Sequence, residues 1–316
     1  MLARVNKVKE ALIETAVRLS GVASVIFMIA IMAFLFRDAL PVLRDTTLGQ
    51  LLSGPDWRPT SAEPQFGYLP LMLGSLLVTG VAIALAVPMG VGCAVFIAEV
   101  VPRWVREVAK PAVELLAAIP SVVFGFIGLT MVGAWIKGVT GLASSRMSAP
   151  EWLKTALDMP TPLAAITGSV VLAFMSLPTI VSIAEDALTA VPRPYRDASL
   201  AMGATKWQTI RRVTVPAARS GILASIMLGI GRTIGETMTV LMVTGNSAVM
   251  PALGKGLFRP VRTMTATIAA EMGETAYRTP HYHALFMLGL CLLLITFAVS
   301  TAADLIMNRT KHVERR

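Results

Sequence analysis

The sequence predicts an all-α integral membrane protein whose chain crosses the bilayer six times. Its 316 residues are 55% hydrophobic and only 15% charged, and the mean hydropathy is +0.68. Soluble domains carry about 25% charged residues, so this composition is typical of a polytopic membrane protein. Six apolar stretches follow one another, each long enough as a helix to cross a hydrocarbon core of about 30 Å. The predicted spans are residues 17–36, 69–98, 108–136, 162–183, 217–243 and 283–307.

The first predicted span, residues 17–36, is interpreted as a retained membrane anchor. It is longer than the apolar core of a signal peptide, and no small-residue cleavage site accompanies it. A polar, proline-containing loop, residues 37–68, separates this anchor from the second span. The chain therefore divides into one anchor and a core of five further spans.

Prolines and glycines interrupt several of the five core spans. The second span is longer than one bilayer thickness, so we expect it to tilt or bend. A short charged turn, residues 99–110, and two polar loops, residues 137–160 and 245–282, are predicted between spans. Prolines 88, 120 and 178 are either bends in moving helices or static kinks, and the sequence does not separate these two roles.

Basic residues orient the spans. With both termini, the turn 99–110 and the loop 185–216 on one side, that side holds most of the 28 Lys and Arg residues. The positive-inside rule predicts that this side is cytoplasmic, and topology then explains most of the net charge of +9. The resulting division is a cytoplasmic N-terminus 1–16, a first transmembrane helix 17–36, a periplasmic loop 37–68, a core 69–307 that includes the cytoplasmic loop 185–216, and a cytoplasmic C-terminus 308–316.

The segment Asp197–Pro216 has the properties of a docking element. It is too polar to enter lipid and long for a connection between neighbouring helices. An apolar stripe at helical spacing predicts one shared face, made by Leu200, Ala204, Trp207 and Ile210. Gly203 interrupts the pattern where a tight turn between two short helices requires positive φ. The alternative interpretation is a basic amphipathic helix that lies on anionic lipid headgroups.

The fifth predicted span carries the one basic residue inside the membrane, Arg232. An arginine at the bilayer centre costs about 2.5–3.5 kcal/mol, so it should face protein or a water-filled cavity. Its spacing from Glu236, Thr239 and Ser225 places all four on one helix face, the candidate wall of a translocation path. The alternative is an Arg232–Glu236 or interhelical ion pair that only holds the bundle together.

Seven residues of the docking segment resemble the EAA loop of ABC-importer permeases, whose pattern is EAA, three residues, G, nine residues and I-x-LP. They are Asp197, Ala198, Ser199, Gly203, Val213, Val215 and Pro216. The departures are conservative, and the spacing, the glycine and the proline are kept. The resemblance implies the type I ABC-importer permease fold. It also implies that Asp197, Ala198, Ser199, Gly203 and Pro216 belong to coupling helices that dock on a separate ATPase subunit.

Four further stretches narrow the resemblance to permeases of the phosphate importer. The sequence GRTIGETM around Arg232 is similar to the GRAxGET signature of phosphate-type permeases. The run from Trp57 to Pro70, the segment Ala117–Gly125 and the stretch Arg262–Glu271 resemble other motifs of the same family. Together they point to the C-type subunit of the two-permease importer. The resemblance implies an A-type permease as heterodimer partner, two copies of an ATPase, a periplasmic phosphate-binding protein, and a location in the bacterial inner membrane.

The chain is predicted to be a transport subunit rather than an enzyme. It contains no GxxxxGK[ST] motif, so ATP and Mg²⁺ should be bound by the partner ATPase and no cofactor is expected here. No catalytic residue is predicted, and three histidines are too few for a convincing metal site. Alternative functions are a permease for sulfate or molybdate, a secondary transporter or channel, and a membrane scaffold for phosphate sensing. The last of these is the hardest to separate from transport by sequence.

Overall fold

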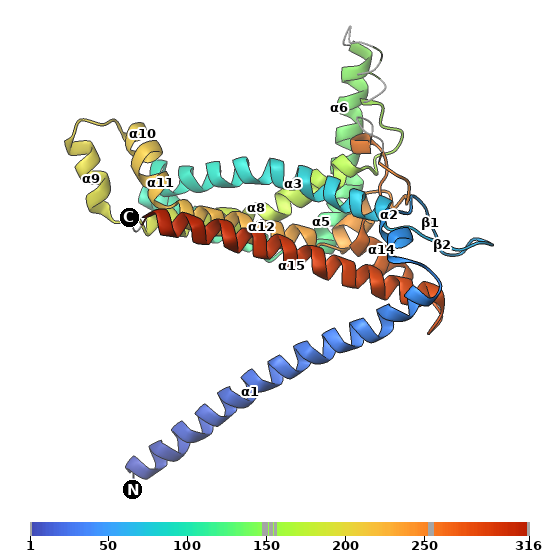
Figure 1. The fold of residues 1–316 in the computed structure, drawn as a ribbon. Helices are drawn as coiled ribbons and strands as arrows, with labels where there is room; N and C mark the ends of the chain where they lie inside the picture. Colours follow the sequence, from blue (N-terminus) through green and yellow to red (C-terminus); the bar gives the residue numbers. More distant parts are fainter. Residues whose placement is uncertain (1, 147–150, 152–153, 155–156, 252–255, 315–316) are drawn as a thin grey trace.

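The protein is almost entirely helical in the computed structural model, as the sequence predicts (Figure 1). The structure describes residues 2–146, 151, 154, 157–251 and 256–314. Within these residues the only strands are β1 (Trp57–Arg58) and β2 (Gln65–Phe66), which pair antiparallel as a small hairpin. The all-α fold class is therefore confirmed.

The helices fall into a long and a short group. The long helices are α1 (Leu2–Ala39), α3 (Leu69–Val95), α8 (Ala165–Thr189) and α15 (Pro280–Glu314). The shorter ones are α2 (Leu48–Ser53), α4 (Arg103–Ala117), α5 (Ser121–Ile127), α6 (Gly133–Arg146), α9 (Arg193–Ala201), α10 (Lys206–Thr209), α11 (Val215–Ala217), α12 (Arg219–Ile234), α13 (Met238–Val243) and α14 (Met264–Glu271). Wider π-helical turns follow α3, α5 and α10, at Phe96–Val100, Gly128–Val132 and Ile210–Thr214.

Five helical segments of the described chain are long and apolar enough to cross a membrane. They are Leu12–Arg44, Leu69–Val100, Ser121–Leu142, Ala165–Thr189 and Pro280–Leu305. A sixth is obtained when Lys206–Ala217 and Arg219–Ile234, which are bent by 69° at their junction, are counted as one broken span. The predicted number of six therefore depends on α12, the helix that carries Arg232.

The predicted boundaries of the third span are wrong at both ends. Residues 103–117 form helix α4 rather than a charged turn, and the span begins at Ser121 instead of residue 108. Pro120 separates the two helices, because proline lacks the N–H that a continuous helix would need and restricts the residue before it. Helix α6 continues to Arg146, into the stretch predicted as the polar loop 137–160.

The predicted outer loop 245–282 also contains a helix. Helix α14 begins after Thr263, whose Oγ1 accepts a hydrogen bond from the Ala266 backbone N–H at 3.3 Å. The backbone N–H of Met264 donates to Ser75 Oγ at 2.9 Å, which joins α14 to α3. Threonine is a preferred N-cap residue, so the sequence did contain a signal for this short helix.

The predicted span 217–243 is not one continuous helix. Helix α12 ends at Ile234, Gly235 follows it, and α13 begins only at Met238. Glycine has low helix propensity, and Glu236 supplies a competing interaction because its Oε1 accepts from the Thr239 N–H at 3.2 Å. The break lies directly after the turn that holds Arg232.

Helix α8 is the centre of the bundle and packs against α3, α4 and α12. Glycines permit close approach between the helices. A Cβ placed on Gly221 of α12 would lie 2.3 Å from Ala187 Cβ of α8, and one on Gly90 of α3 would lie 2.8 Å from Ile180 Cγ2. Helix α1 instead diverges from the bundle (Figure 1), and the ring of Phe34 near its end packs on Phe286 of α15.

The two ends of the molecule differ in what they carry (Figure 1). The start of α1, the end of α15 and the short helices α9 and α10 lie toward one end. The hairpin β1–β2, helix α2 and helix α14 lie at the other, and α6 stands away from the bundle there. Both ends of the chain and the docking helices, which were predicted to share a side of the membrane, thus lie toward a common end of the molecule.

Candidate functional site

The docking segment folds as two short helices joined by a tight turn, which confirms that part of the prediction. Helices α9 and α10 flank Gly203, whose φ is +84°. Helix α10 begins at a capping box, in which Thr205 Oγ1 accepts from the Gln208 N–H and the Gln208 side chain accepts from the Thr205 N–H. These local interactions define the turn without help from the bundle.

The residues of the predicted apolar stripe differ in their exposure. Ala204 lies in the turn rather than in a helix, and Ile210 is buried. Leu200 and Trp207 are exposed, and so is Met202, which is 88% exposed and was not part of the predicted stripe. Exposed large apolar side chains on an otherwise polar segment make a candidate surface for a partner or for lipid headgroups. We call Leu200, Met202 and Trp207 the docking surface.

The five predicted coupling residues lie around this surface. Asp197 and Ala198 are exposed on α9, while Ser199 turns inward and its Oγ lies 3.0 Å from Thr209 Oγ1. That hydrogen bond links the two docking helices. Gly203 is exposed at the turn, and Pro216 is exposed within α11, at the junction with α12.

The four predicted path residues do not share one environment. Ser225 is fully buried, and its Oγ donates to the Ile222 carbonyl oxygen at 2.7 Å. Thr239 is also buried, and its Oγ1 donates to the Ser121 carbonyl oxygen at 2.9 Å. Arg232 is exposed and Glu236 half-buried. The four residues therefore do not form the single exposed face that was predicted, since the hydroxyls of Ser225 and Thr239 donate to backbone carbonyl oxygens of the protein itself.

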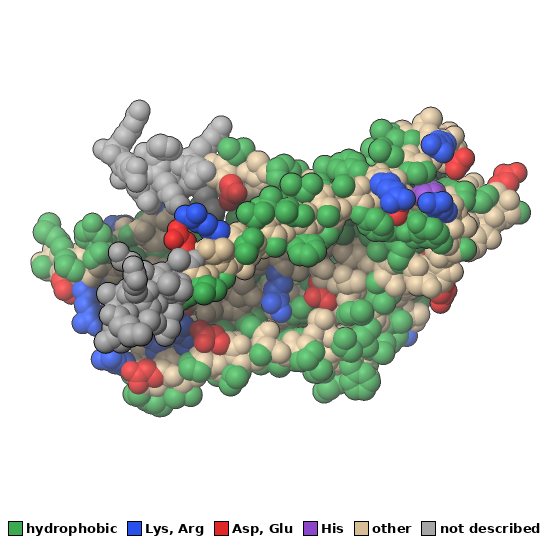
Figure 2. Space-filling model, turned by 90° about the horizontal axis from the view of Figure 1, so that it is seen from below, with side chains coloured by type: hydrophobic (Ala, Val, Ile, Leu, Met, Phe, Trp, Pro, Cys, Tyr) green, Lys and Arg blue, Asp and Glu red, His purple; other side chains and the backbone are tan. Residues whose placement is uncertain are grey.

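Arg232 is not held by a carboxylate in this structure. No Asp or Glu of the described residues lies within 4.0 Å of its guanidinium, so the alternative Arg232–Glu236 ion pair is not formed. The Glu236 carbonyl oxygen accepts from Thr265 Oγ1 at 2.9 Å, which ties the break in the fifth span to α14. Figure 2 shows a hollow along one face of the molecule, flanked by apolar side chains, with basic and acidic side chains inside it. An exposed, unpaired arginine can accept an anion without first losing a partner.

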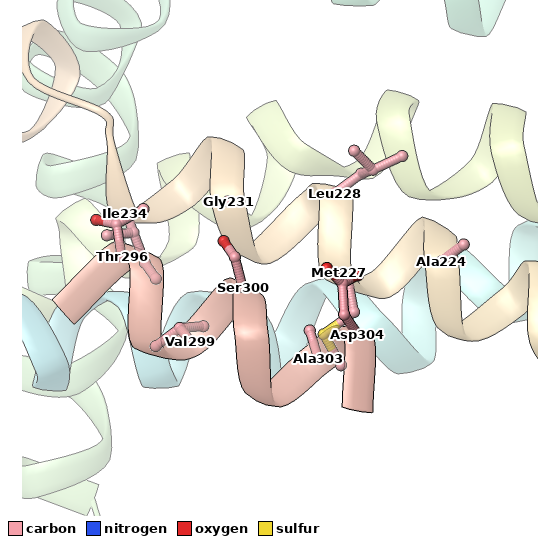
Figure 3. Close-up of a pocket in the computed structure, with 10 residues that line it drawn as sticks. All are labelled: Ala224, Met227, Leu228, Gly231, Ile234, Thr296, Val299, Ser300, Ala303 and Asp304. Carbon is pink, nitrogen blue, oxygen red and sulfur yellow. The ribbon is translucent and has the colours of Figure 1, made fainter. Parts of the chain in front are cut away.

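A cleft of about 320 Å³ lies between α12 and α15 (Figure 3). Its lining is mainly apolar, with Gly231 and Ile234 from the turn of Arg232 and with Ser300 and Asp304 from α15. The carboxylate of Asp304 would repel an anion. No Lys or Arg among its lining residues offsets that charge, so this cleft does not suit an anion path, although it borders the helix that carries Arg232.

A charged network surrounds the base of the docking segment. The carboxylate of Glu185, only 1% exposed near the end of α8, pairs with Arg106 and with Lys110 Nζ at 3.0 Å. Lys110 also pairs with Asp186, and that hydrogen bond raises the pKa of Lys110 above its ordinary value. The sequence did not reveal this network, because its basic members lie in the stretch interpreted as a turn.

A second polar cluster lies at the opposite end and gathers residues of two separate motifs. The carboxylate of Glu271 accepts from Trp57 Nε1 at 3.1 Å, lies 2.8 Å from His281 Nε2 and pairs with Arg262. The motif around Trp57 and the motif Arg262–Glu271 are thus in direct contact. Among the described residues no group of three His, Cys, Asp or Glu side chains could hold a metal ion.

The apolar spans and their arrangement define a class, a polytopic helical membrane permease with short helices at one end. Solved structures of ABC importers share this fold. A bacterial alginate ABC transporter, solved with an alginate-bound periplasmic protein, matches with a TM-score of 0.56 at 14% identity over 90% of this chain and 91% of that one. The MetNI methionine ABC transporter matches with a TM-score of 0.53 at 18% identity, over 75% and 93% of the respective chains.

The chain belongs to the family of binding-protein-dependent transport system inner membrane components, whose family profile matches residues 86–312. A probable ABC transporter permease, YqgH of Bacillus subtilis, is 36% identical over 93% of this chain and 88% of its own length. The phosphate transport system permease PstC of Mesorhizobium japonicum is 32% identical over 95% and 90%. PstC 1 of Mycobacterium tuberculosis is 31% identical over 96% and 95%.

Proposed function

We propose that this chain is the transmembrane permease subunit of an ATP-driven importer that moves inorganic phosphate across the bacterial inner membrane. The observation that carries the proposal is the pairing, in one chain, of a docking surface with an unpaired arginine beside a broken span. The relatives named as phosphate transport permeases support the substrate. The chain itself acts as a transport subunit.

Energy for transport comes from a separate ATPase, which binds ATP and Mg²⁺ in place of this chain. Two ATPase copies would dock on Leu200, Met202 and Trp207 and on the equivalent surface of a related A-type permease. A periplasmic phosphate-binding protein would deliver the anion at the end that carries the Glu271 cluster. Both termini and the docking segment would face the cytoplasm, as the positive-inside rule favours.

The mechanism we propose is alternating access. Closure of the ATPase pair moves α9 and α10, and the helices joined to them reorient around a central cavity. Phosphate then passes Arg232 transiently, with Glu236 and the break at Gly235 beside it. A single arginine suits passage, because a tighter site would retain the ion, and affinity is supplied by the binding protein.

The test is reconstitution of this chain with its candidate ATPase, sister permease and binding protein in liposomes. We expect ATP-dependent uptake of labelled phosphate that requires every component and that excess sulfate or molybdate does not inhibit. Inhibition by either competitor would favour a permease for another oxyanion. Uptake without the ATPase would overturn the proposal, and a complex that hydrolyses ATP but moves no anion would favour a phosphate-sensing scaffold.

A further inference from the structure

Arg196 of α9 makes contacts with three different parts of the chain. Its Nε and Nη2 donate to Glu99 Oε1 at 3.1 and 2.8 Å. Its Nη1 donates to the Val191 carbonyl oxygen and its Nη2 to the Leu188 carbonyl oxygen, both at 2.7 Å. The two side chains are largely enclosed, with Arg196 19% and Glu99 10% exposed. A guanidinium so fully bonded is fixed in one geometry.

The contact with Leu188 caps the last turn of α8, and the contact with Val191 reaches the linker that follows it. The last carbonyl groups of a helix have no partner within it, and a cation there is also stabilised by the helix dipole. Only Ala190, Val191 and Pro192 separate α8 from α9 along the chain, so these contacts join neighbours. They fix the angle at which the docking helix leaves α8.

The contact with Glu99 joins segments 97 residues apart. Glu99 lies in the π-helical turn Phe96–Val100 that ends α3, where the extra residue in the turn alters the direction of the side chains. Breaking an enclosed pair by removing one partner is costly, since the remaining charge stays buried. An apolar cluster of residues from α3, α8, α12 and their connections lies in the same region, with Ala94, Ala184, Leu188, Val191, Ala218 and Ile222 as its buried members.

We propose that Arg196 is a positioning residue that clamps the docking helix α9 to the end of α3 through Glu99. The docking segment would then move three spans directly, α8 and α12 through the chain and α3 through the clamp. This inference rests on the proposed function, because it assigns the route by which force from the ATPase enters the bundle. Arg196 itself would touch neither phosphate nor ATP.

The consequence is a specific defect when the clamp is broken. Helix α9 would stay attached to α8 and could still dock on the ATPase through the exposed surface of Leu200, Met202 and Trp207. The ATPase would therefore continue to hydrolyse ATP, while α3 would no longer follow the docking helices. Fewer phosphate ions would be moved for each ATP consumed.

The first measurement is the ratio of phosphate imported to ATP hydrolysed by the complete reconstituted complex. We expect Arg196→Gln and Glu99→Gln each to lower this ratio about tenfold, with membrane level and ATP hydrolysis kept. Arg196→Lys keeps the charge but loses the forked geometry, so its ratio should lie between these variants and the parent. The control is Arg193→Gln, which removes an exposed arginine from the same helix and should change neither quantity.

The second measurement tests the contact between α9 and the end of α3 directly and does not depend on transport. Spin labels at Tyr195→Cys and Val100→Cys, both exposed, would measure the distance from α9 to the end of α3 in the full complex with Cys93 and Cys291 replaced. Arg196→Gln and Glu99→Gln should broaden this distance distribution, and Arg193→Gln should not. The clamp is overturned if the distribution stays narrow in both, or if uptake and hydrolysis fall in proportion. A parent complex that moves no phosphate would refute the proposed function, and the distances alone would then decide the clamp.

Discussion

Gly203 has a φ of +84° at the turn between α9 and α10, a backbone conformation that residues other than glycine rarely adopt. No atom lies within 4 Å of the position that a Cβ would take there. Any cost of a substitution at Gly203 therefore arises from the backbone conformation and not from a steric clash.

Arg232 is exposed, and no Asp or Glu of the described residues forms an ion pair with its guanidinium. An arginine without a carboxylate partner is available to a passing anion.

Replacing Gly203 by valine should uncouple ATP hydrolysis from phosphate uptake while the protein stays in the membrane. The left-handed conformation costs an L-residue about 1–2 kcal/mol, so the turn would relax and α10 would shift from its docking position. Gly203→Asn is the matched control, since asparagine tolerates this region and Asn246 adopts a φ of 53° in this chain. Uptake by reconstituted Gly203→Val equal to that of the parent would refute the docking role.

Replacing Arg232 by glutamine should depress phosphate uptake about tenfold or more with assembly intact. The reason is the loss of a hydrogen bond to a charged group, which contributes about 1.5–3 kcal/mol. The measurement is the initial rate of phosphate uptake, with complex assembly followed by co-purification of the ATPase. Arg259→Gln is the control, because Arg259 forms only an exposed pair with Asp158 at 3.3 Å. Loss of assembly with Arg232→Gln would instead assign the residue a structural role.

Helices are held together by two different means in this bundle. Helices α8 and α12 approach closely through glycine, as Gly221 faces Ala187. Helix α4 instead contacts α8 through three of its charged residues, as Arg106, Lys110 and Glu114 meet Glu185, Asp186 and Ser182. The apolar residues Trp104, Val108 and Leu115 of α4 are left exposed on the outside. Outside the spans, such an apolar helix face suits the membrane interface or an apolar partner.

Replacing Gly221 by valine should destabilise the protein by about 1–3 kcal/mol, since inserted atoms would force α12 away from α8. A Cβ at this position would lie 2.3 Å from Ala187 Cβ, which has no flexible side chain to move aside. The measurement is the midpoint of thermal unfolding in detergent. Gly231→Val on the same helix is the control, because no atom lies within 4 Å of its Cβ position. Equal midpoints for the two variants would contradict the role of close packing.

At the scale of the whole molecule, charged clusters are separated along the axis of the bundle. The docking helices, the Arg196–Glu99 pair and the Glu185 network lie at one end, and the Glu271 cluster and the hairpin lie at the other. Arg232 and the broken span lie between the docking helices and α14 along the chain. A protein arranged in this way can receive force at one end and substrate at the other.

The topology can be tested by labelling single cysteines in intact cells. In a parent without Cys93 and Cys291, Ser61→Cys in the hairpin loop should react with a membrane-impermeant maleimide added outside. Arg211→Cys in the docking segment should react only after the inner membrane is permeabilised, because the positive-inside rule places it in the cytoplasm. The cysteine-free parent is the control for background. The reverse pattern would overturn the orientation.

The sequence by itself determined the membrane fold class, the existence of the spans and the turn at Gly203. Those features depend on local properties, namely runs of apolar residues and a backbone position that favours glycine. The family resemblance also followed from the sequence, since its motifs keep fixed spacings around Asp197 and Arg232. The true extents of α4 and α6 escaped detection. Arg106 and Lys110 lie on one side of α4, and only their partner Glu185 on α8 shows that these two side chains are turned inward.

The tertiary structure decided the rest, because it depends on contacts between distant segments. Whether Ser225 and Thr239 line a path or bond backbone oxygens could not be read from their helical spacing. The spacing of Arg232 and Glu236 allowed an ion pair on one continuous helix. The helix ends at Ile234, before Glu236, and the pair is not formed. The pairs Arg196–Glu99 and Trp57–Glu271 join segments 97 and 214 residues apart. No local pattern specifies such pairs, since they form only when the packed helices bring their ends together.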